Sequence, residues 1–112
     1  MKRLLTVGML ACVVFAAPPG AVADATHPAA RAKVRIVDFA FKPQVRTVTV
    51  GTKVIWINRG ASTHTSTSDD GRWDSPPLAP GQRFTFVFSS PGSYTYHCSI
   101  HLAMTGEVDV TP

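Results

Sequence analysis

The sequence predicts an all-β fold, a Greek-key β-sandwich of about seven to eight short strands. Two observations carry this prediction. From residue 34 onward, short runs of β-branched, aromatic and other apolar residues alternate with turn residues such as Gly, Pro and Asp. Outside an apolar N-terminal stretch, no segment places its apolar residues at helical spacing.

The first 23 residues read as a secretory signal peptide. Lys2 and Arg3 precede an apolar stretch over residues 4–17, and Ala21-Val22-Ala23 has the small-residue pattern of a cleavage site. The stretch is shorter than the ~20 residues that cross a bilayer, so we expect an exported, periplasmic or extracellular protein without a membrane span in its mature form. Residues 24–33 are predicted to form a flexible leader, and residues 34–112 one domain.

Three strands are predicted in the first half of this domain. Residues 34–41 form the first, with a bulge where the alternation slips near Val37-Asp38. Residues 45–50 follow Pro43 and form the second. Residues 53–58 are apolar on both faces, so they are predicted to form a central strand.

The second half adds about four strands. Residues 65–68 form a short polar one, which ends at the Asp69-Asp70-Gly71 turn. Apolar and polar residues then alternate over residues 84–88 and, after Pro91-Gly92, over residues 94–98. Val108 and Val110 define the last strand by the same period of two.

The charge balance and the cysteine content limit the kinds of function that this protein can have. Without Lys2 and Arg3, nine Lys and Arg residues stand against seven Asp and Glu residues, and no cluster of basic residues along the sequence points to nucleic acid. Cys98 is the single cysteine of the predicted mature chain, so an internal disulfide is excluded. An exposed free thiol is a liability in an oxidising compartment, whereas metal ligation would occupy and protect it.

Near the C-terminus, Cys98, His101 and Met104 follow one another at intervals of three residues. In an extended strand, six residues span ~20 Å, so these side chains can share one ion only if residues 99–103 curl into a tight loop. His64, which follows the predicted central strand, is the available fourth donor. One thiolate, two imidazoles and a weak thioether are the donors of a blue-copper electron-transfer site, so the sequence predicts one type 1 copper ion.

These residues resemble the cupredoxins, and most closely the amicyanin and plastocyanin-like group. The resemblance covers nearly all of residues 34–110. Besides the ligand loop up to Met104-Thr105-Gly106, it is carried by these segments: Asp38-Phe39-Ala40-Phe41-Lys42-Pro43, Val50-Gly51-Thr52, Trp56-Ile57-Asn58, His64-Thr65, Leu78-Ala79-Pro80-Gly81, Pro91-Gly92-Ser93-Tyr94 and Tyr96-His97-Cys98.

The resemblance implies a two-sheet sandwich with copper at one end and with the edge of His101 at the surface as the electron port. It implies that Tyr94 forms a tyrosine corner and that residue 65 gives its backbone N–H to the Cys98 sulfur. The chain departs from the amicyanin pattern at Ile100 and Leu102, where prolines are usual, and at Thr65, where Asn is frequent.

Other residues are assigned around the predicted site. Aromatic side chains are candidates for its apolar surround, namely Phe39, Phe41, Phe86 and Tyr96. His97 is not expected to be a ligand, because on a strand its side chain faces away from that of Cys98.

We therefore expect an exported monomer that is not an enzyme and that carries single electrons between redox proteins, which dock transiently near His101. One alternative keeps the same site but uses it for copper storage, delivery or resistance. A copper enzyme would need further histidines for a second centre, and the whole chain has four. A metal-free immunoglobulin-like binding module is the remaining alternative.

Overall fold

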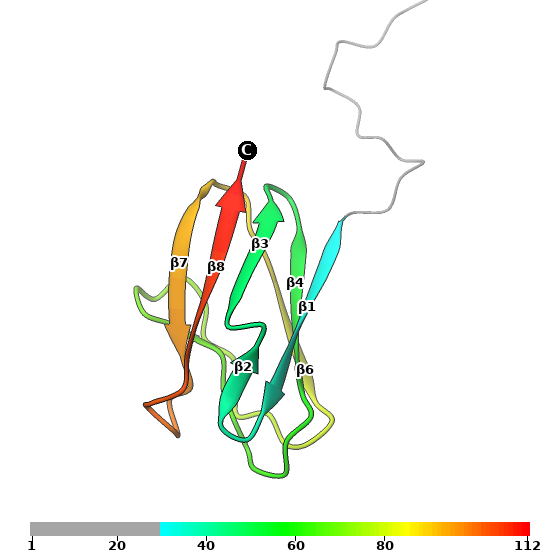
Figure 1. Cartoon of the computed structure of the whole chain (residues 1–112), viewed down its shortest axis with the longest axis vertical. Helices are drawn as coiled ribbons and strands as arrows, with labels where there is room; N and C mark the ends of the chain where they lie inside the picture. Colours follow the sequence, from blue (N-terminus) through cyan, green and yellow to red (C-terminus); the bar gives the residue numbers. More distant parts are fainter. Residues whose placement is uncertain (1–29) are drawn as a thin grey trace, which may run out of the picture.

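The computed structural model describes residues 30–112, so the predicted signal peptide, Cys12 and most of the predicted leader lie outside the described residues. The described part consists of eight strands and the loops between them (Figure 1). No helix in this part has the length and apolarity needed to cross a membrane. The predicted all-β sandwich is confirmed.

The strands form two sheets of four. In order across the first sheet these are β2 (Ala40–Lys42), β1 (Arg31–Val37), β4 (Lys53–Asn58) and β6 (Arg83–Val87). In order across the second they are β3 (Val45–Thr49), β8 (Thr105–Thr111), β7 (Gly92–His97) and β5 (Thr67–Ser68). Both sheets are mixed, because β1 pairs with β4 and β3 pairs with β8 in parallel.

The first strand differs from its prediction in two ways. It begins at Arg31, inside the predicted leader, because Ala32 is buried and residues 31–36 pair along β4. The predicted bulge near Val37-Asp38 is instead a tight turn, after which β2 folds back and Val37 pairs with Ala40. A reversal over two residues disturbs the alternation in the same way as a bulge, which explains why the sequence suggested one bulged strand.

The core lies between the sheets and is rich in aromatic residues. Trp56 of β4 is fully buried, and its ring lies 5.5 Å from Tyr96 of β7 and 5.6 Å from Trp73, measured between ring centroids. Tyr96 also packs against Phe41, with 4.7 Å between centroids. Burial raises the pKa of the Tyr96 hydroxyl to about 12, although the Trp56 indole lowers it slightly. These contacts join the two sheets.

The tyrosine corner that the resemblance implied is present in the fold, and a second contact fixes the start of β8. The Tyr94 hydroxyl donates a hydrogen bond of 2.7 Å to the carbonyl of Ser90, four residues upstream, as in a tyrosine corner. Gly106 lies so close to the Tyr96 ring that a Cβ atom there would clash with it. Gly106 is the second residue of β8 and pairs with Tyr96, so this close packing holds the start of the strand against β7 just after the predicted ligand loop.

Candidate metal centre

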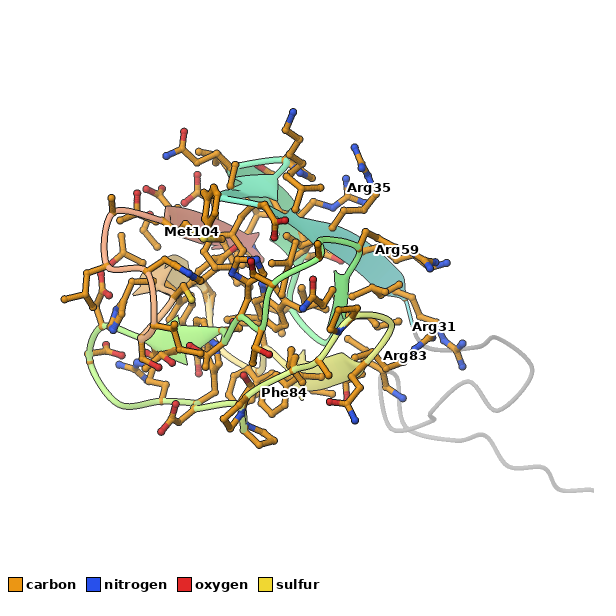
Figure 2. The ribbon with its side chains drawn as sticks, turned by 90° about the horizontal axis from the view of Figure 1, so that it is seen from below. Arg31, Arg35, Arg59, Arg83, Phe84 and Met104 are labelled. Atoms are coloured by element: carbon orange, nitrogen blue, oxygen red, sulfur yellow. The ribbon has the colours of Figure 1, made fainter. Side chains whose placement is uncertain are left out.

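Three connections meet at one end of the sandwich, the lower end in Figure 1. They are the β1–β2 turn, the segment that follows β4 and the loop between β7 and β8. Figure 2 looks onto this end and labels Met104 there. The predicted ligands belong to the second and third of these connections, so residues separated by more than thirty positions in sequence become neighbours.

Backbone pairing with Leu78 holds His64 in place, and Asn58 fixes the segment of chain that leads to it. Its N–H and carbonyl pair with the carbonyl and N–H of Leu78, at 3.1 and 2.7 Å. The buried Asn58 amide donates to the carbonyls of Ser62 and Leu78, both at 2.8 Å, and its oxygen accepts the N–H of Gly60. An amide side chain that satisfies three backbone groups fixes the path of the chain from β4 to the histidine.

The loop after β7 curls as the spacing predicted. The N–H of Cys98 donates to the carbonyl of Met104 at 3.1 Å, and the N–H of Met104 donates to the carbonyl of His101 at 2.9 Å. Met104 is therefore folded back beside Cys98, and its side chain is 3% exposed. The loop returns the chain to β8 within a few residues.

The donor atoms of three predicted ligands converge. The Nδ1 atoms of His64 and His101 lie 3.2 Å apart, and they lie 3.9 and 3.8 Å from the Cys98 Sγ atom. A point equidistant from all three atoms is about 2.1 Å from each, which is close to ordinary metal–nitrogen and metal–sulfur bond lengths. His64 and Cys98 are buried, while His101 is partly exposed. The residues present therefore fit one metal ion.

Asp38, which the sequence analysis did not assign to the site, contacts the far side of the His64 ring. Its Oδ1 atom lies 2.7 Å from His64 Nε2, and its carboxylate also accepts the backbone N–H groups of Ala61 and Ser62. The hydrogen bonds from His64, Ala61 and Ser62 lower the pKa of Asp38. A carboxylate at Nε2 favours the proton on that atom, which leaves the Nδ1 lone pair free for a metal.

The hydrogen bonds around Cys98 favour the thiolate form of its side chain. Burial raises its pKa, but backbone N–H groups of Thr65, His101 and Ile100, together with His64, lower it, and the result is a pKa of about 6. The Thr65 N–H donates to the sulfur at 3.4 Å, as the resemblance implied. A thiolate is the form of cysteine that ligates metals.

Thr65 also joins the two ligand-bearing segments, although Asn is frequent at this position in the amicyanin pattern. Its hydroxyl accepts the N–H of Ser99 at 2.8 Å and lies 3.1 Å from the Ser99 hydroxyl. These hydrogen bonds hold the residue after His64 against the residue after Cys98, so the two ligands cannot move apart easily.

The predicted apolar surround is found in part. The Phe39 ring lies 5.0 Å from the His101 ring and 6.1 Å from the His64 ring, although Phe39 is 60% exposed. Phe86 packs instead against Trp73 and Phe88. His97 faces away from the three donor atoms and makes a short contact with Asp69, in keeping with its exclusion as a ligand.

Sequence and structure comparisons identify proteins that are similar to this chain. A family model described as a cupredoxin-like domain matches residues 6–110. Amicyanin of Paracoccus denitrificans is 32% identical over 120 residues, which cover 91% of this chain and 92% of that protein.

Two solved structures are also similar. A purple cupredoxin from Nitrosopumilus maritimus has a TM-score of 0.66 and 32% identity, with 71% of this chain and 99% of that chain covered. A Cu-containing nitrite reductase from Thermus scotoductus has a TM-score of 0.71 and 31% identity over 85% of this chain, but only 25% of the reductase is covered. With its two-sheet fold and its match to the family model over most of its length, the chain belongs to the cupredoxin-like domain family.

Proposed function

We propose that this chain is an exported type 1 copper protein that carries single electrons between redox proteins. The observation that carries the proposal is the triangle formed by the Cys98 sulfur and the Nδ1 atoms of His64 and His101. Copper bound there would supply a one-electron couple between Cu(I) and Cu(II). The buried thioether of Met104 is proposed as the weak fourth ligand, a set typical of blue-copper sites.

The hydrogen bonds around the triangle favour a carrier over a copper-delivery protein. Thr65 bonds both the Cys98 sulfur and Ser99, and the Cys98 N–H bonds the Met104 carbonyl. These bonds hold the donors in one arrangement, so little protein movement would accompany a change of oxidation state. A delivery protein must release its ion, which a fixed and largely buried donor set opposes.

The exposed side chains at this end suit brief contacts with other proteins. Phe39, Ile100 and Leu102 are large apolar residues with substantial exposure, and Leu102 is 72% exposed. His101 lies among them as the partly exposed member of the donor set. We propose that redox partners dock on this apolar rim, because small apolar patches serve contacts that form and break quickly.

The carrier function is tested by loading the purified chain with copper(II) and measuring its redox behaviour. We expect one equivalent to bind, reversible one-electron cycling in voltammetry, and fast electron self-exchange in NMR line-broadening experiments. Slow self-exchange, together with a large structural rearrangement between the Cu(I) and Cu(II) forms, would favour storage or delivery. Failure to bind copper would favour a metal-free binding module.

Replacing Asp38 with asparagine is expected to raise the reduction potential and to weaken copper(II) binding by about tenfold. The substitution removes a negative charge that lies 2.7 Å from the His64 ring, and this loss favours the less positively charged Cu(I) state. Voltammetry and competition titrations measure both effects. Asp109→Asn is the matched control, because it removes the same charge on β8, where Asp109 contacts the side chains of Ser93 and Glu107 rather than a predicted ligand. An unchanged reduction potential in Asp38→Asn would contradict the assignment of His64, with Asp38 behind it, as a copper ligand.

A further inference from the structure

The outward face of the β2-β1-β4-β6 sheet carries an unusual concentration of positive charge. Along β1, the buried residues alternate with exposed Arg31, Lys33 and Arg35. The strand pairing places Lys53 of β4 beside Arg31, and Lys42 of β2 beside Arg35. We name this surface the basic face; its residues are Arg31, Lys33, Arg35, Lys42, Lys53, Arg59 and Arg83.

The charge is densest at the end that holds the candidate metal centre. In the sheet register, Lys42 lies beside Arg35 on one side. On the other side Ile57 of β4 lies beside Arg35, and Arg83 of β6 lies beside Ile57. Arg59 comes directly after β4, and its N–H bonds the carbonyl of Ile36 on β1. Figure 2 shows Arg31, Arg35, Arg59 and Arg83 along one side of the molecule as seen from this end.

No carboxylate within residues 30–112 neutralises this face. The four strands of the sheet contain neither Asp nor Glu. In the described part of the chain, ion pairs join Asp38 to His64, Asp69 to His97 and Asp70 to Arg72. None of these ion pairs includes a residue of the basic face. The acidic residues Glu107 and Asp109 lie on β8 of the other sheet.

Such a pattern is unfavourable for the isolated fold. Neighbouring strands lie about 4.8 Å apart, and like charges placed side by side across them repel each other. The register places Lys33 beside Ile55, and Arg35 and Arg83 beside Ile57, so the apolar stems of these cations help to bury the two outward isoleucines while their charged ends stay exposed. A partner with negative charge would relieve this repulsion.

We propose that the basic face docks the acidic surface of a protein partner, and that this partner is the electron donor or acceptor; the second part rests on the proposed function. Two observations favour a protein over an anionic membrane. The charge is concentrated beside the metal centre, where a redox partner must come close. Among large apolar residues, only Val87 projects from the strands of this face with substantial exposure, so little of it could insert into lipid.

The docking step is tested with the copper-free full chain and poly-L-glutamate as the acidic probe. We expect NMR shifts on β1, β2, β4 and β6, and weaker binding as salt screens the charges. Arg35→Gln with Arg83→Gln should lower the affinity for the probe by about tenfold. The matched control, Ser89→Glu with Thr111→Glu, changes the net charge equally at exposed residues off the basic face and should have less than about a twofold effect. Equal losses in both variants would overturn the proposal.

The redox part is tested with the copper-loaded chain and small oxidants. Oxidation by hexacyanoferrate(III), an anion, should slow in the arginine variant, whereas oxidation by tris(phenanthroline)cobalt(III), a cation, should not. If both rates stay unchanged while poly-L-glutamate binding is lost, the face docks an acidic protein but does not serve electron transfer. A chain that fails to bind copper would refute the proposed function and leave the copper-free docking result standing.

Two other occupants have distinct outcomes. Vesicles of phosphatidylglycerol in phosphatidylcholine that bind more tightly than poly-L-glutamate, and lose binding in the arginine variant, would assign the face to a membrane. Self-association of the chain at low salt, abolished by the same variant in sedimentation experiments, would assign it to the acidic sheet of a second copy. Either outcome would overturn the docking of an acidic partner protein.

Discussion

Replacing Cys98 with serine is expected to abolish the intense visible absorption that copper(II) should produce with the unaltered chain. That absorption is a charge transfer from a thiolate to copper, and a serine hydroxyl is neither soft nor deprotonated at neutral pH. The Cys98 sulfur is the one sulfur donor in the triangle with His64 and His101, so no neighbouring thiol among the described residues can replace it. Titration with copper(II), followed by visible spectroscopy, measures the effect.

Two controls make this result specific. Cys12→Ser removes the other cysteine of the full chain, which lies in the predicted signal peptide, and should leave the absorption intact. Ser99→Ala removes the hydroxyl that contacts Thr65 but keeps the backbone bond from Ser99 to the same residue, so the band should also persist. A band that survives in Cys98→Ser, or disappears in Cys12→Ser, would refute the metal centre described above.

Replacing Trp56 with alanine is expected to destabilise the domain by about 3–5 kcal/mol. The side chain is fully buried and packs against Trp73, Phe84 and Tyr96, so its removal leaves a large cavity between the two sheets. Domains of this size have unfolding free energies of about 5–15 kcal/mol, and much of the total would be lost. Urea unfolding followed by circular dichroism gives the difference in free energy.

The same variant tests whether the fold and the metal centre are linked. An ion that binds only the folded state stabilises it by mass action, so copper should shift the unfolding midpoint of Trp56→Ala upward. Trp56→Phe keeps an aromatic ring at the position and should cost less than the alanine variant. A loss below about 1 kcal/mol in Trp56→Ala would show that the aromatic core does not hold the sheets together as described.

The strands were predictable because their signals are local. Alternating residues over 84–88 and 94–98 matched β6 and most of β7, and the apolar run over 53–58 matched β4. The turn at Asp38 was missed because it takes only two residues. Its carboxylate accepts hydrogen bonds from His64, Ala61 and Ser62, all more than twenty positions away, and no local pattern reveals such partners.

By itself, the sequence determined the type of fold and the chemistry available to it. Period-two strands and turn residues specify a sandwich, and the spacing of Cys98, His101 and Met104 specifies a curled loop with soft donors. Only the tertiary structure decided that His64 meets Cys98, that Asp38 contacts His64, and that seven cations share one face. These features depend on strand register and on contacts between distant segments, whose free energies come from the packing of the two sheets rather than from any short stretch of chain.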